Sequence, residues 1–411
     1  MIKNPSQRFR AIVRVTRICA DICGTDVFQP NYHINIRTVL VSIVIIISFF
    51  SCGYCIYDSI SVKDDWTLVI QAMCMGGGTL VQGLSHIVCF IRRSDDVLCL
   101  LEETYILYEF YEEKDAGYRL YLNRGVYLLT RLMKICAFVN IILAVGMSMV
   151  TLIFNSIVGQ RVLIVGIFLP GLDVDTQNGF LTTMFLQSCF ITVGAFGLYA
   201  GDMATLTSIS QIMTFKGILR CKFRDLNEIL MDEPDNKCKS MEAIRDRNRV
   251  RNTSVYRLKN QNWQIVFLSA QLSISICSFV NRSRSITYWI IFTKIVTNFF
   301  GLVCTVFCIL LGVWPAGYIY MAYCLTMMYV YCGVGTKIDI ANEGFIEACY
   351  NDVLWYEMAA HERKMLHTMM IMTHNTKGLT IGPVLPLSVN TGLQVTKMIY
   401  SMTMLLFKFV E

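Results

Sequence analysis

The sequence predicts an all-α membrane protein with seven transmembrane helices. Hydrophobic residues make up 55% of the 411 residues and charged residues only 16%, whereas a soluble domain is about 45–50% apolar and about 25% charged. Apolar runs of roughly 20 residues, the length that crosses about 30 Å of hydrocarbon, recur along the chain. The Lys and Arg residues behind the net charge of +6 lie between these runs, which indicates membrane orientation rather than a nucleic-acid surface.

Residues 1–35 are predicted to form a cytoplasmic N-terminal segment. They contain basic residues and no long apolar stretch, so we expect no cleavable secretory signal. Apolar residues recur at helical spacing among the arginines, which favours a short amphipathic helix on the inner membrane surface, and a disordered basic tail is the alternative. The apolar residues of this helix are Phe9, Ile12, Val13 and Val15.

Seven apolar segments account for the predicted spans, and the first six lie within residues 36–336. Pro315, just before the sixth span, favours a sharp turn between antiparallel neighbours. A large inner loop over residues 202–285 joins the fourth span to the fifth. Its apolar stretch 266–280 is too short to cross the membrane, so we expect a helix packed under it. The spans are placed at residues 36–57, 67–91, 132–154, 181–201, 286–312, 316–336 and 388–408.

Basic residues between the spans predict the orientation. Lys and Arg number 29 on the side of the N-terminus and 3 on the other side. By the positive-inside tendency, the N-terminus is cytoplasmic and, after seven crossings, the C-terminus is outside. None of the 17 cysteines falls in a predicted outer segment, where disulfides would persist. The glycosylation sequons at Asn252 and Asn281 fall in the inner loop and should stay unmodified.

Motifs of enzymes and metal sites are missing from the sequence. There is no phosphate-binding loop or nucleophile elbow, and His361-Glu362 lacks a second His at the zinc-protease spacing. Cys52 and Cys55 form a CxxC inside the first span without further ligands, so we interpret them as small packing residues. We therefore expect no enzymatic activity, no metal and no cofactor.

The C-terminal part of the sequence contains a specific set of short elements. They are Tyr350 to Trp355-Tyr356, Lys364 and Leu366, Leu379-Thr380, Pro386-Leu387-Ser388, and the run Lys397, Tyr400-Ser401 and Leu405-Leu406. As a set they resemble the C-terminal signature of insect odorant receptors. The length, the seven spans, the inverted orientation and the large basic inner loop extend this resemblance over the whole chain. G-protein-coupled receptors, by contrast, have their amine end outside and an inner tail after the seventh helix.

The resemblance implies an odorant-gated, non-selective cation channel in the plasma membrane of sensory dendrites, a tetramer in which tuning subunits join olfactory co-receptor subunits. The co-receptor has a much longer inner loop, so this chain resembles a ligand-specific tuning subunit. Residues 337–387 would be a cytoplasmic anchor region between subunits, and residues 388–411 the pore-lining seventh helix. A gustatory receptor of the same superfamily is the alternative, and a membrane transporter is a more distant one.

Two faces of the seventh helix, about 120° apart, compete for the pore. One is a polar stripe of Asn390, Gln394, Lys397, Ser401 and Lys408. Alignment with the family, anchored on Tyr400, favours the other face, whose bulky apolar ring could close a pore by dewetting. Packing between helices is the alternative for Thr403 and Phe407. The expected pore and gate residues are Thr396, Ile399, Thr403 and Phe407.

Volatile ligands are small and mostly apolar, so their site should be a closed cavity lined by aromatic, Met and aliphatic groups with one or two hydrogen-bonding side chains. The outer halves of the second, third, fourth and sixth spans supply such residues, and ordinary core packing is the alternative for each. The candidate ligand-binding residues are Ile70, Met73, Cys74, Met147, Val150, Phe154, Met184, Ser188, Tyr320 and Tyr323.

Overall fold

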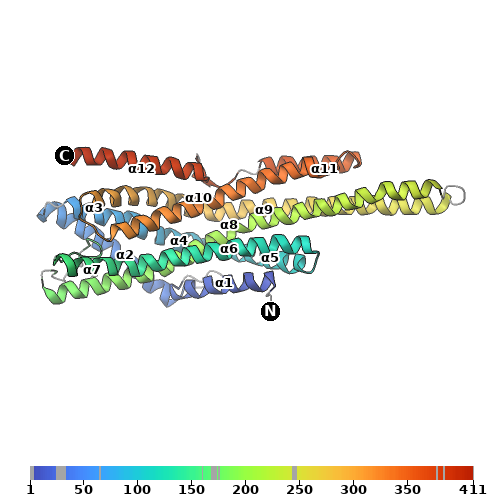
Figure 1. Ribbon diagram of the computed structural model, residues 1–411. Coiled ribbons are helices and arrows are strands. Elements are labelled where there is room, and N and C mark those ends of the chain that lie inside the picture. Colours follow the sequence, from blue (N-terminus) through green and yellow to red (C-terminus); the bar gives the residue numbers. More distant parts are fainter. Residues whose placement is uncertain are drawn as a thin grey trace.

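The computed structural model is a bundle of long helices with one very short β-hairpin. It describes residues 4–24, 34–63, 66–159, 161–167, 174, 176–242, 248–375, 378–382 and 385–410. Each of the seven predicted spans coincides with helix to within two residues at its ends, which confirms the all-helical fold class. The C-terminus lies at the same end of the bundle as α3 (Trp66–Met75) and α7 (Met147–Val158), whereas α1 (Pro5–Ile22) begins toward the opposite end, near α5 (Ser94–Glu112) (Figure 1).

The first three predicted spans correspond to α2 and to two helices that each contain a wider π-helical turn. Helix α2 is Ile36–Asp58, followed by η1 (Ser59–Lys63). The second span is α3 (Trp66–Met75), η2 (Gly76–Leu80) and α4 (Val81–Arg92), and the third is α6 (Ala116–Ile141), η3 (Ile142–Gly146) and α7 (Met147–Val158). At η2 the backbone approaches another helix closely, because a Cβ on Gly78 would lie 2.7 Å from the Tyr320 hydroxyl.

The segment expected to be a large inner loop is mostly helix. Helix α8 (Gln177–Glu242) and helix α9 (Asn248–Leu310) pack against each other, and residues 243–247 lie outside the described residues. At 66 residues, α8 is about 100 Å long, about three times the thickness of the hydrocarbon. The apolar stretch 266–280 lies inside α9. Its Ser269 and Ser273 are buried, and Phe279 contacts Phe215 of α8 edge to face.

A tight turn joins α9 to α10 (Gly317–Glu347), as Pro315 predicts. Gly312 has φ +69°, a left-handed conformation that favours glycine at a helix end. The indole Nε1 of the buried Trp314 in this turn donates a 2.8 Å hydrogen bond to the carbonyl of Ile164. This bond fixes the turn to the segment that connects α7 to α8.

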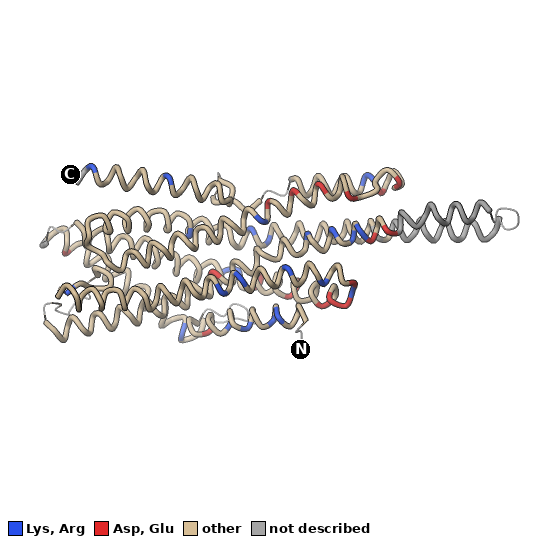
Figure 2. The backbone as a smooth tube through the Cα atoms, viewed as in Figure 1, with Lys and Arg blue, Asp and Glu red and all other residues tan. Residues whose placement is uncertain are grey.

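Charged residues gather in one half of the bundle. Figure 2 shows few charges along α2, α3 and α7, and many around α1 (Pro5–Ile22), α5 (Ser94–Glu112) and α11 (Ala360–Asn375). The part of the apolar face of α1 that contains Phe9 is covered by protein, because Phe9 is buried against the rings of Tyr105 and Tyr108. Val15, by contrast, is 40% exposed.

Within the described residues, six helices are long and apolar enough to cross a membrane, and they contain the first six predicted spans. The seventh predicted span is α12 (Val389–Val410), which falls outside that set because polar residues interrupt its apolar sequence. After η4 (Ala348–Asp352) and α11, the strands β1 (Thr380–Ile381) and β2 (Leu385–Pro386) form an antiparallel pair. The hairpin leads into α12, which packs on α9 and α10.

Candidate functional site: an apolar cavity beside a buried ion pair

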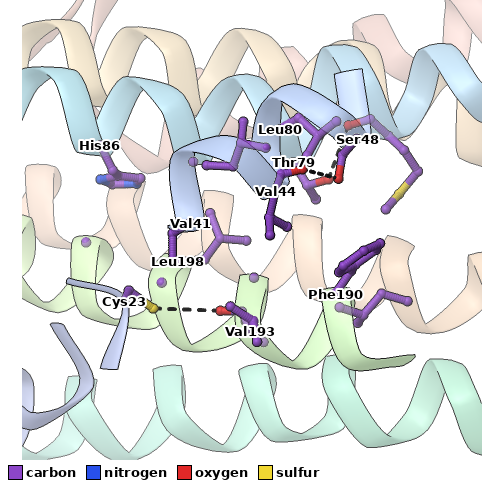
Figure 3. Close-up of a pocket in the computed structure, with 18 of the residues that line it drawn as sticks. Cys23, Val41, Val44, Ser48, Thr79, Leu80, His86, Phe190, Val193 and Leu198 are labelled. Atoms are coloured by element: carbon purple, nitrogen blue, oxygen red, sulfur yellow. Dashed lines mark hydrogen bonds between the residues drawn. The ribbon is translucent and has the colours of Figure 1, made fainter. Parts of the chain in front are cut away.

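A cavity of about 200 Å³ lies between α2, α4 and α8 (Figure 3). It is smaller than the roughly 300–1,000 Å³ pockets that hold drug-sized ligands, so its occupant would be a smaller molecule. Most of its wall is aliphatic or aromatic. The side chains that Figure 3 labels along it are Cys23, Val41, Val44, Ser48, Thr79, Leu80, His86, Phe190, Val193 and Leu198.

Several polar side chains on the cavity wall are satisfied by nearby backbone. The hydroxyl of Ser48 donates to the carbonyl of Val44 at 2.8 Å, and that of Thr79 donates to Met75 at 3.2 Å. The Cys23 thiol points to the carbonyl of Val193 at 3.9 Å, and burial raises the pKa of this thiol to about 11. These three groups offer a ligand little unused hydrogen-bonding capacity, whereas Ser51 Oγ and His86 Nδ1, on the same wall, are buried without a hydrogen-bond partner among the described residues. The rest of the wall offers mainly dispersion and apolar burial.

The segment 161–167 closes one end of the cavity. Gln187 of α8 donates to the carbonyls of Val165 and Ile167 at 2.9 Å, and its Oε1 accepts from the Val165 amide. Gln71 of α3 accepts a 3.0 Å hydrogen bond from the Gly166 amide. Because α3 and α8 both hold this segment through buried hydrogen bonds, Val165 and Ile167 form a fixed part of the lining.

A buried ion pair lies beside the cavity. Lys294 Nζ on α9 lies 2.9 and 2.8 Å from the two carboxylate oxygens of Asp202 on α8, and the two side chains are 1% and 0% exposed. The hydroxyl of Tyr331 on α10 donates to Asp202 Oδ1 at 2.8 Å. His86, which lines the cavity, has its Nε2 3.6 Å from the same oxygen. Lys294 falls inside the predicted fifth span, and ionisable side chains inside membrane-spanning segments are rare and usually functional.

A second polar layer lies about one turn from the ion pair. The amide nitrogen of Gln82 on α4 donates to Thr297 Oγ1 at 2.7 Å and to Asn298 Oδ1 at 2.8 Å, both on α9. All three side chains are buried. Polar bonds therefore join α4 to α9 directly beneath the cavity wall.

The structure brings two of the ten predicted ligand residues to the cavity wall, Met147 and Tyr320. Tyr323 is fully buried next to Tyr320, and the Cys74 thiol lies 3.3 Å from Thr305 Oγ1, inside the bundle. Ser188 shares a 3.0 Å hydrogen bond with Ser148. Of the others, Met73 is 57% exposed, Met184 is buried, and Ile70, Val150 and Phe154 are half-buried, all away from the cavity lining.

The residues predicted for the pore lie on the packed side of α12. Ile399 and Thr403 are 6% and 2% exposed, Thr396 and Phe407 are half-buried, and α12 packs on α9 and α10. The polar stripe lies on another, exposed side of the same helix. In a single chain, therefore, the face expected to line the pore is covered by protein and the competing face is free.

Neither the contribution of α2 to the cavity wall nor the ion pair of Asp202 and Lys294 was predicted from the sequence. Lys294 falls inside a predicted span, where a basic residue is a functional signal by itself. Asp202 falls one residue beyond the predicted end of the fourth span, so it was counted with the inner loop. The contribution of α2, through residues such as Val44 and Ser48, has no comparable signal in the sequence.

Comparisons with known proteins point to one group of receptors. The family model described as "7tm Odorant receptor" matches residues 65–400. The Drosophila melanogaster protein named "Putative odorant receptor 83c" is 25% identical over an alignment of 411 positions that covers 98% of each chain. The insect olfactory receptor OR5 from Machilis hrabei matches over 98% of this chain and 99% of its own, with a TM-score of 0.70 and 12% identity.

The structure of the same OR5 in complex with eugenol matches with a TM-score of 0.72 and 11% identity, over 99% of this chain and 100% of that one. At this level of identity the two structures establish the common fold and nothing more specific. The match over nearly the full length of both chains shows that the fold includes α12.

Proposed function

Because the chain belongs to the insect odorant receptor family, we propose that it is the odorant-binding tuning subunit of a heteromeric, odorant-gated, non-selective cation channel. Its partners would be olfactory co-receptor subunits in a tetramer, and its location the plasma membrane of sensory dendrites. The family match sets aside the gustatory-receptor and transporter alternatives. The same membership makes the chain a membrane receptor and not an enzyme.

The observation that carries this proposal is the apolar cavity between α2, α4 and α8. Its size suits a small volatile molecule, and its wall offers aliphatic, aromatic and Met groups such as Val44, Phe190 and Met147. A ligand of about ten heavy atoms with few polar contacts gains little free energy, so we expect micromolar responses. Met75 and Met147, with flexible thioether chains, would widen the range of accepted ligands.

The proposed orientation places the N-terminus in the cytoplasm and the C-terminus outside. The distribution of charge supports it, because Lys and Arg gather in the half of the bundle that contains the start of α1 (Figure 2). The position of the C-terminus at the other end of the bundle fits an odd number of crossings (Figure 1). With this orientation the segment 161–167 covers the outer end of the cavity.

We place the shared pore on the exposed polar face of α12. A pore between subunits needs a face that one chain leaves uncovered, and Ile399 and Thr403 do not meet this condition because they pack on α9 and α10. Hydroxyl and amide groups on the exposed face can replace part of the hydration shell of a passing cation. The pore-lining candidates are therefore the neutral polar residues of this face, Asn390, Gln394 and Ser401.

The test is to express the chain with and without an insect olfactory co-receptor and to record whole-cell current during application of an odorant panel. The proposal requires an odorant-evoked cation current that depends on both proteins, with a response absent from cells that contain the co-receptor alone. Current from this chain alone would contradict the tuning-subunit role. Uptake of a solute without current would contradict the channel.

A further inference from the structure

One turn of α8 contacts the cavity on one side and the ion pair on the other. Leu198, Gly201 and Ala204 line the cavity, whereas Asp202, next to Gly201, turns into the bundle toward α9 and α10. The missing side chain of Gly201 makes room for the imidazole of His86, since a Cβ there would lie 2.6 Å from His86 Nδ1. A ligand that displaces this turn or His86 therefore also displaces the surroundings of the Asp202 carboxylate.

Asp202 holds two further helices in place. Its carboxylate binds Lys294 of α9 and Tyr331 of α10 at 2.8–2.9 Å, in a region without exposed surface. The Lys294 ammonium also lies 5.7 and 5.9 Å from the ring centres of Tyr323 and Tyr331 on α10. Leaving a buried charge without its partner strongly destabilises the folded protein. We therefore expect α8, α9 and α10 to move together rather than one at a time.

The same part of α10 is bonded to α12. The Tyr329 hydroxyl, two residues from Tyr331, shares a 2.9 Å hydrogen bond with Thr396 Oγ1. Two turns after Tyr329, Thr336 Oγ1 accepts a 2.9 Å hydrogen bond from the Val389 amide at the start of α12. Residues 329–336 of α10 thus contact the ion pair on one side and α12 on the other.

We propose that the cluster of Asp202, Lys294 and Tyr331 couples occupancy of the cavity to the position of α12. The inference rests on the proposed function, because it takes α12 as the pore helix and the cavity as the ligand site. The three side chains are positioning residues, since they act through the helices they join and do not line the cavity. His86 is the member of the surrounding group that both lines the cavity and approaches Asp202.

Tyr331→Phe is the mildest test, because it removes one hydroxyl and keeps the ring. Co-expressed with the co-receptor, the variant should reach the cell surface at the wild-type level. Its concentration for half-maximal response should be raised at least about tenfold, which corresponds to the loss of one hydrogen bond to a charged group. A purely structural role would lower the number of channels but leave this concentration unchanged. An unchanged concentration for half-maximal response in Tyr331→Phe would overturn the inference.

The second test removes both charges at once. The double variant Asp202→Asn with Lys294→Met leaves no unpaired buried charge, so its fold is better preserved than that of either single variant. We expect the odorant-evoked current per surface subunit to fall at least tenfold while the ligand-free current persists. The matched control is Glu103→Gln with Arg282→Met, which neutralises a 2.8 Å pair between α5 and α9 that is about one-third exposed. The control should respond like the wild type.

The outcomes distinguish failure of the proposed function from failure of the coupling role alone. If the wild-type chain gives no odorant-evoked current with a co-receptor, the proposed function fails and the coupling role fails with it. If the wild type responds and Tyr331→Phe keeps its concentration–response curve, only the coupling role is rejected. Should the double variant not reach the surface, Tyr331→Phe decides the question alone.

Discussion

The hydroxyl of Tyr329 lies 2.9 Å from Oγ1 of Thr396, and this hydrogen bond joins α10 to α12. It fixes the rotation of α12 about its own axis, because the residues one and two turns after Thr396 must then face the same neighbours. Ile399 and Thr403 are accordingly buried, and Ser401, which lies between them in sequence but points to another side of the helix, is exposed. The family-based alignment and the packing of the chain therefore favour different faces of one helix for the pore.

Cysteine substitution distinguishes these two faces. We expect Ser401→Cys to be modified by a charged, water-soluble thiol reagent during odorant application, with a change of the current, and Thr403→Cys to be unreactive. Both positions lie in the same turn of α12 and differ chiefly in the direction they face. The wild-type chain controls for its own cysteines. Modification of Thr403→Cys without modification of Ser401→Cys would restore the pore face of Thr396, Ile399, Thr403 and Phe407.

Filling the cavity should remove the response. A Cβ on Gly83, which lines the cavity, would meet no atom within 4 Å, so the side chain of Gly83→Leu can enter the cavity without displacing protein. We expect at least a tenfold higher odorant concentration for half-maximal current, or no response, measured at equal surface expression. Gly53→Leu is the matched control, because its Cβ also meets nothing but Gly53 lies on the exposed side of α2. Equal loss in both variants would argue against this cavity as the ligand site.

The sequence predicts the features that depend on neighbouring residues and not those that depend on packing between distant helices. Span lengths and the turn at Pro315 depend on neighbouring residues, and the structure has helices at every predicted span. The cavity depends on how helices distant in sequence pack, so Phe190 and Val44 could not be assigned to it in advance. A helix over residues 266–280 is expected from the sequence, but its continuity with the fifth span in α9 is not, because it depends on burial of Ser269 and Ser273 against neighbouring helices.

The proposed orientation predicts different fates for the two chain ends. An epitope tag at the C-terminus should be stained by its antibody on intact cells, and an epitope tag at the N-terminus should be stained only after permeabilisation. Asn281 is exposed on α9 and belongs to a sequon, so its accessibility makes it a reporter of the compartment. We expect no mobility shift when glycosidase is applied to the wild-type chain. A C-terminal extension with an added sequon is the control and should be glycosylated, and a glycan on Asn281 would reverse the orientation.

The docked N-terminal helix predicts a specific loss of stability. Phe9 is 0% exposed, its ring stacks on Tyr108 with centres 4.9 Å apart, and it meets Tyr105 edge to face at 5.4 Å. Truncating a phenylalanine in such a core costs about 3–5 kcal/mol through lost burial and the cavity left behind. We therefore expect Phe9→Ala to reduce the amount of receptor at the cell surface severalfold, measured by surface biotinylation.

The matched control for Phe9 lies on the other face of the same helix. Ile18 is 57% exposed, so Ile18→Ala removes an apolar side chain of similar hydrophobicity without opening a cavity in the protein. Its surface level should stay close to that of the wild type, because the contacts between α1 and the helices α5, α6 and α8 are kept. If Phe9→Ala and Ile18→Ala reached the surface equally well, α1 would contribute nothing to the folded bundle, as a disordered basic tail would.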